Sequence, residues 1–206
     1  MHQKHRVSAS ITVALVLIGL LAWPATAQSP TASTVTGQAT GVQATVFGIL
    51  GTATTTVLSD SGAIGAINQE QDVGQDTGSV ASLLTADVMN SSTYSYANEV
   101  DSEAALGDLN LTVGAVRITA DSVLAEASQV LGAPSSGRSY IDNLAINGVP
   151  IVVTGAPNQT IPIPGGQVVC NEQTTSQNGT TVVNALHITV NGTADVVIST
   201  ARVGIS

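Results

Sequence analysis

Nucleophilic catalysis in this chain would have to use His187 or Cys170, the one histidine and the one cysteine that follow position 27. A hydrolytic triad needs a nucleophile, a base and an acid that orients the base, and no G-x-S-x-G elbow occurs in the sequence. We therefore expect no catalytic residue, and a hydrogen-bonded His187 that faces a neighbouring strand or solvent. Cys170 follows two valines, which predicts a buried, inert thiol, with a disulfide to a second chain as the alternative.

An acidic, glycine-containing segment offers the candidate cation site. Asp72 and Asp76 alternate with Gly74 and Gly78 in residues 70–78, which we expect to form a loop. Calcium binds several closely spaced oxygen ligands, but the segment lacks the ligand spacing and the final Glu of an EF-hand. We expect a solvated acidic loop and no cofactor, with weak calcium binding by Asp72 and Asp76 as the alternative.

Two further pairs of residues could contact a ligand. Tyr94 and Tyr96 are two residues apart, so on a strand they share one face and could stack on a sugar ring. Asn158 and Gln159 follow a proline, and their amides could bind sugar hydroxyls or the backbone of a neighbour. The competing interpretations are cross-strand packing for the tyrosines and a rigid, self-bonded turn for the amides.

The N-terminal segment predicts that the chain is exported and that the residues above belong to a secreted domain. Residues 1–27 read as a signal peptide with a basic start, an apolar stretch over 11–21 and a cleavage motif ending at Ala27. We expect residues 28–206 to form one secreted all-β domain, flexible at 28–34, with no C-terminal anchor and no membrane insertion after cleavage. That part has three arginines, no lysine and 14 acidic residues, a net charge of −11. Such a charge disfavours nucleic acid and anionic lipid as partners.

The sequence pattern predicts strands. Small and β-branched residues alternate over 33–47 and 52–58, and again over 180–190 and 194–203, where Asn191-Gly192 suggests a type I′ turn. Prolines break residues 143–175 into short strands. Residues 98–106 and 121–131 contain good helix formers, but they also alternate with period two, which favours strands over helices.

An internal duplication supports the same fold class. Residues 84–88 resemble residues 118–122 at an offset of 34, and the segments that follow, around Leu109 and Leu144, are offset by 35. A repeat of this length is typical of a β-hairpin used twice in an antiparallel β-sandwich of jelly-roll type, and a short β-solenoid is the alternative.

Several short segments together resemble one protein family. The residues that carry the resemblance are NGVP at 147–150, VTGAPNQT at 153–160, PGG at 164–166, NEQT at 171–174, NALHI at 184–188, ADVVI at 194–198 and ARVGI at 201–205. In order and spacing they resemble the choice-of-anchor P proteins, which are secreted bacterial surface proteins without an established activity. The resemblance implies an extracellular surface protein. We therefore expect a non-enzymatic structural or adhesive protein whose partners are copies of itself, other extracellular proteins or glycans, with a carbohydrate-binding module as the alternative.

Overall fold

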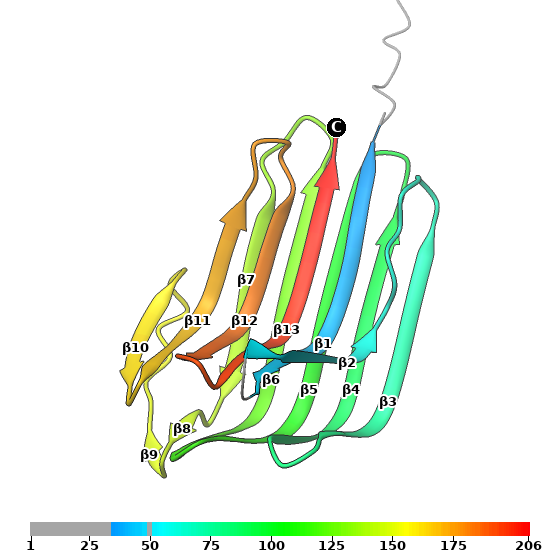
Figure 1. Cartoon of the computed structure of the whole chain (residues 1–206). Coiled ribbons are helices and arrows are strands. Elements are labelled where there is room, and N and C mark those ends of the chain that lie inside the picture. Colours follow the sequence, from blue (N-terminus) through cyan, green and yellow to red (C-terminus); the bar gives the residue numbers. More distant parts are fainter. Residues whose placement is uncertain (1–33, 49–50) are drawn as a thin grey trace, which may run out of the picture.

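The computed structural model describes residues 34–48 and 51–206. About 72% of the structure is strand, arranged in two antiparallel β-sheets that pack face to face (Figure 1). In chain order the strands are β1 (Val35–Phe47), β2 (Ala53–Asp60), β3 (Glu70–Val80), β4 (Leu84–Ser95), β5 (Glu99–Val113), β6 (Val116–Val130), β7 (Ser136–Asp142), β8 (Ala145–Ile146), β9 (Val149–Pro150), β10 (Gln159–Ile163), β11 (Gly166–Thr175), β12 (Thr181–Val190) and β13 (Ala194–Ile205). The predicted all-β sandwich is confirmed.

Each sheet is built mainly from strands that follow one another in the chain. Sheet A has the order β10-β11-β12-β13-β1-β2, and sheet B has the order β3-β4-β5-β6-β8-β9, with β7 also paired to β6. This order is a meander, simpler than that of a jelly roll, in which only β1 leaves the chain order to pair with β13. No solenoid is observed in the part of the chain that the structure describes.

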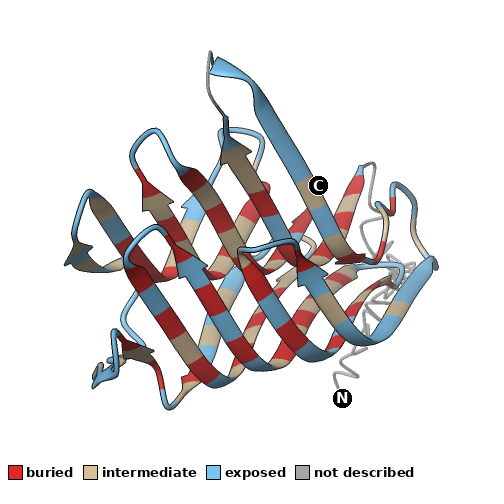
Figure 2. Cartoon of the chain, turned by 60° about the horizontal axis from the view of Figure 1, so that its bottom comes forward, coloured by how far each residue is buried: buried red, intermediate tan, exposed pale blue. Residues whose placement is uncertain are grey.

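Alternation of side chains produces the core. In β5, Val100, Ser102, Ala104 and Leu106 are buried between the sheets, while the residues between them face outward. Figure 2 shows this alternation as bands of buried and less buried residues along the strands. The buried side chains are mainly Val, Ile, Leu and Ala, which suit the flat interface between two sheets.

The register of sheet B agrees with the internal duplication. Leu84 of β4 and Ile118 of β6 both lie opposite Leu111 of β5, one on each side. Ile118 also pairs with Ile146 of β8, as Leu84 pairs with Leu111. The hairpin β4–β5 and the hairpin formed by β6 with β7 and β8 therefore carry the repeat in equivalent positions.

The alternation in sheet A is interrupted once in each of five neighbouring strands, at the same level. The interrupting residues are Asn171, Ala185, Ser199, Gly41 and Ser59, which lie side by side across β11, β12, β13, β1 and β2. Alternate residues of this row have a left-handed backbone. Their φ values are 52° at Asn171, 52° at Ser199 and 50° at Ser59. We call these five residues the offset row. In β12, β13 and β1, the strand buries odd-numbered residues on one side of the row and even-numbered residues on the other.

The offset row turns polar side chains into the space between the sheets. Ser199 donates a hydrogen bond to the carbonyl of Val123 in sheet B over 3.1 Å, and Ser59 bonds to the hydroxyl of Ser91 in sheet B over 3.2 Å. Asn171 donates to the carbonyl of Gly155 over 2.8 Å. Buried polar groups are stable only when they are hydrogen-bonded. The two serine bonds join the sheets, and the Asn171 bond holds the loop between β9 and β10.

The segments with helix-forming residues and the proline-rich segment form strands, while one hairpin turn differs from its prediction. Residues 98–106 and 121–131 lie largely in β5 and β6 and are not helical, and the proline-rich segment forms short strands as predicted. The hairpin between β12 and β13 is present, but its turn has three residues, and of these Gly192 alone has a positive φ. A type I′ turn needs two consecutive residues with positive φ, so that prediction is wrong.

The predicted signal peptide and the start of the flexible segment lie outside the described residues. Thr34 directly precedes β1, and its backbone is hydrogen-bonded to that of Ser206. Within residues 34–48 and 51–206, no helix has the length and apolar character needed to cross a membrane.

Candidate functional site

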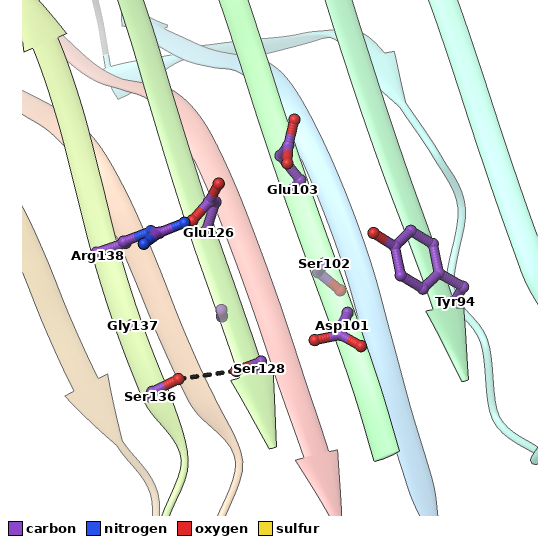
Figure 3. Close-up of a pocket in the computed structure, with 10 residues that line it drawn as sticks. Tyr94, Asp101, Ser102, Glu103, Glu126, Ser128, Ser136, Gly137 and Arg138 are labelled. Atoms are coloured by element: carbon purple, nitrogen blue, oxygen red, sulfur yellow. Dashed lines mark hydrogen bonds and ion pairs between the residues drawn. The ribbon is translucent and has the colours of Figure 1, made fainter. Parts of the chain in front are cut away.

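The outer face of sheet B carries a hollow of about 490 Å³ (Figure 3). It lies over β4, β5, β6 and β7, because the register of these strands places their outward side chains in rows. The two rows are Tyr94, Asp101, Ser128 and Ser136, and then Ser92, Glu103, Glu126 and Arg138. All of these residues except Ser92 line the hollow. The hollow is therefore bounded by one aromatic ring, three carboxylates, two serine hydroxyls and one guanidinium.

The carboxylates of the hollow are held in an electronegative setting. Burial raises the pKa of Glu103, as does the charge of Glu126 directly opposite on β6, while Arg138 acts in the other direction. Burial and the charge of Glu99 likewise raise the pKa of Asp101. Arg138 is paired with Glu126 and is the single cation among the lining residues. This surface favours ligands that donate hydrogen bonds or carry positive charge, and it disfavours anions.

Tyr94 joins this hollow to a second one of about 330 Å³, which is also lined by Tyr96 and Glu70. The two tyrosine rings meet edge to face, with centroids 6.2 Å apart. Burial, followed by the charge of Asp101, raises the pKa of Tyr94, so its phenol stays protonated and able to donate a hydrogen bond. The predicted aromatic pair thus lies at a concave surface beside hydrogen-bonding groups.

Asn158 and Gln159 lie in the other sheet, at the start of β10, and take no part in this surface. The Gln159 amide accepts a bond from the backbone of Thr154 over 2.7 Å and donates one to the carbonyl of Val152 over 2.8 Å. The Asn158 side chain accepts a bond from the backbone of Gln173 over 2.9 Å. These amides fix the conformation of their own loop, so the two predicted ligand-contact pairs do not form one site.

Asp72 and Asp76 lie in β3, so the expectation of an acidic loop over 70–78 is wrong. Residues four apart on a strand are separated by about 13 Å, which is too far for both carboxylates to bind one ion. Among the residues that the structure describes, no group of three or more His, Cys, Asp or Glu side chains is arranged to hold a metal ion. The calcium hypothesis assumed a loop at residues 70–78, and these residues form a strand instead.

His187 lies between two carboxylates on the outer face of sheet A. Its Nδ1 is 2.9 Å from Glu172, and its Nε2 is 3.1 Å from Asp195. Glu172 also accepts a bond of 2.7 Å from Asn184. Both ring nitrogens are therefore occupied by acids and neither bonds a hydroxyl or a thiol, so the prediction of a hydrogen-bonded surface histidine is confirmed.

We expect the stability of the protein to fall above about pH 6.5 because of His187. Burial alone would lower the pKa of His187, but the hydrogen bond and charge of Glu172, together with Asp195, outweigh it and raise the pKa above its usual value. The folded state therefore binds a proton that the unfolded chain releases, and this stabilisation is complete below about pH 6.5 and disappears as the pH rises through the folded-state pKa. The effect should be about 1 kcal/mol or less, as for other partly exposed ion pairs.

Urea unfolding at pH 6 and at pH 8 measures this effect. His187→Gln keeps a hydrogen-bonding side chain but cannot titrate, so it should lose that part of the pH dependence. An equal decrease in the wild type and in the variant would show that His187 is not responsible.

Cys170 is fully buried, as predicted, and burial raises the pKa of its thiol to about 11. Reactive cysteines need thiolate character and access, and this residue has neither. A disulfide to a second chain would require Cys170 to leave the core.

Of the residues that line the hollow, Tyr94 was predicted from the sequence, whereas Asp101, Glu103, Glu126 and Arg138 were not. One signal was available, because Glu99, Asp101 and Glu103 alternate and must share a face of any strand. No protein-family model, curated protein or solved structure matches this chain. The functional argument therefore rests on the geometry of this surface.

Proposed function

We propose that this protein is a secreted, non-enzymatic adhesive protein of the cell surface that binds a carbohydrate without acidic groups in the hollow of sheet B. The observation that carries the proposal is the combination of Tyr94 with three carboxylates and two serine hydroxyls around one concave surface. Tyrosine packs against the apolar face of a sugar ring, while carboxylates and hydroxyls bind its hydroxyl groups. The signal sequence and the resemblance to the choice-of-anchor P proteins support an extracellular location.

Charge defines the class of ligand. The lining residues hold three carboxylates against one guanidinium, in a chain that is acidic throughout. A sulfated or uronic acid-rich glycan would be repelled, whereas a neutral or amine-bearing glycan would not.

Replacing Tyr94 with alanine is expected to weaken glycan binding at least tenfold, since loss of a stacked ring costs about 1.4 kcal/mol or more. A glycan array should identify neutral or amino-sugar ligands, and calorimetry on one of them should give the change in Kd. Tyr140→Ala is the matched control, because Tyr140 is 60% exposed on β7 and does not line the hollow. Binding that is equal in both variants, or an array on which only acidic glycans bind, would refute the proposal.

Retaining glycoside hydrolysis is a second candidate, favoured by the position of Glu103 directly opposite Glu126. Side chains opposed across two strands have Cβ atoms about 5 Å apart. Two glutamates in such a pair can bring their carboxyl groups to the separation of about 5 Å that retaining enzymes use. The fate of a bound oligosaccharide distinguishes the two functions. A binding protein leaves its oligosaccharide intact, whereas a hydrolase releases reducing ends and loses this activity in Glu103→Gln.

A further inference from the structure

The sandwich has several free strand edges, and they differ in how well they could pair with another strand. An edge strand presents backbone groups that can extend the sheet, and proteins protect such edges with charges, prolines and short strands. Within the described residues, β2 and β10 are the edges of sheet A, β3 and β9 end the main order of sheet B, and β7 is a further edge beside β6.

All of these edges except that of β2 carry a protecting feature. β3 has Glu70, Asp72 and Asp76 along its length, and β7 has Arg138 and Asp142. β10 contains Pro162, and β9 is two residues long and ends in Pro150. β2, in contrast, has neither a charge nor a proline from Ala53 to Ser59.

The composition and exposure of β2 suit strand pairing. Its sequence, ATTTVLSD, is rich in β-branched residues, and most of its length is exposed (Figure 2). Val57 is 44% exposed and Phe47, on the adjoining end of β1, is 41% exposed. The hairpin is held internally by a hydrogen bond of 2.8 Å between the hydroxyls of Thr45 and Thr55. Among the described residues, β2 is therefore an ordered strand that pairs with β1 on one side and with no strand on the other.

We propose that β2 pairs antiparallel with β2 of a second copy of this chain, so that the two A sheets become one continuous sheet. A second copy is the occupant that the charges favour. A basic partner would be attracted to the acidic edge of β3 and to the hollow, whereas two β2 strands bring no charged side chains against each other before Asp60. Main-chain hydrogen bonds supply the affinity of such an interface, and the exposed Val57 adds apolar contact.

The symmetry of the pair fixes the possible registers. A two-fold axis perpendicular to the sheet keeps each side chain on its own face, and residues directly opposite each other in a sheet share a face. The axis must therefore pass through a residue position and not between two positions. An axis at Thr56 uses the regular part of the strand, which ends before the left-handed Ser59. It places Thr55 opposite Val57 of the second copy and Thr54 opposite Leu58.

Light scattering coupled to size exclusion tests this interface on the full chain as processed by a secreting host. We expect the wild type to form a dimer. Val57→Lys should weaken the dimer at least about tenfold, because the two lysines become diagonal neighbours across the new contact and repel each other. Val152→Lys is the matched control, since Val152 is 82% exposed and lies between β9 and β10, outside β2. This variant should dimerise like the wild type. A monomeric wild type, or equal dimerisation of both variants, would overturn the proposal.

Cross-linking gives a second readout that does not depend on the folding of Val57→Lys. Cys170 is buried, so a cysteine introduced on the surface would be the accessible thiol. Thr56→Cys should form a covalent dimer under mild oxidation, because the axis brings the two copies of this residue together. Thr77→Cys, on the acidic edge strand β3, should not. Failure of Thr56→Cys to cross-link, in a sample that is dimeric by light scattering, would show that the dimer uses another surface.

Discussion

Replacing Gly166 with alanine is expected to destabilise the protein by about 3 kcal/mol or more, the range of severe overpacking. Gly166 begins β11, directly after the turn at Gly165, and lies opposite Val190 of β12. A β-carbon at position 166 would overlap the carbonyl oxygen of Thr189 and lie 2.8 Å from its carbonyl carbon. These are backbone atoms, so relief requires β11 and β12 to move apart.

Urea unfolding followed by circular dichroism measures the loss. Gly74→Ala is the matched control, because a β-carbon at position 74 of β3 meets no atom within 4 Å. That exposed change should alter the free energy of unfolding by less than about 0.5 kcal/mol. If Gly166→Ala unfolded at the same urea concentration as Gly74→Ala, the close approach of β11 to Thr189 would be incorrect.

Replacing Leu111 with alanine is expected to cost about 3 kcal/mol or more, because it leaves a cavity in the hydrophobic core. Leu111 is fully buried and is the residue of β5 that lies between Leu84 and Ile118, the equivalent leucine and isoleucine of the two repeats. Removal of its side chain therefore removes one cross-strand contact in each copy of the repeat, with Leu84 and with Ile118.

Thr112→Ala tests whether the loss is due to the cavity. Thr112 is the next residue of β5, but it faces outward and is exposed, so its change should cost less than about 0.5 kcal/mol. The difference between the two variants, read from thermal or urea unfolding, isolates the burial of Leu111. A cost below about 1 kcal/mol for Leu111→Ala would mean that sheet B repacks around the lost side chain.

The sandwich could be predicted because alternation and duplication are local properties of the sequence. The offset between Leu84 and Ile118 even gave their equivalent places beside β5. The strand β3 could not be predicted in the same way, since its three acids and two glycines have low strand propensity. An edge strand exposed to solvent tolerates such residues, and β4 supplies the pairing that the sequence of β3 does not favour by itself.

The candidate site was predicted only in part, for a related reason. Tyr94 was identified because Tyr94 and Tyr96 are two residues apart, a spacing that places both rings on one face of a strand. The group of Asp101, Glu103, Glu126 and Arg138 comes from three strands, and only the register of those strands brings it together. Register depends on long-range pairing, which a single sequence does not display.

The offset row has a consequence for how this chain finds its register. Alternation alone prevents a strand from slipping by one residue, since every side chain would change face, but a slip of two residues keeps all faces correct. In a chain built from small, similar residues, such a slip would change the packing little. Because neighbouring strands of sheet A share an interruption at one level, a slip of two would set the extra residue of one strand against a regular stretch of the next. The row therefore favours the observed strand register over registers of similar energy that are shifted by two residues.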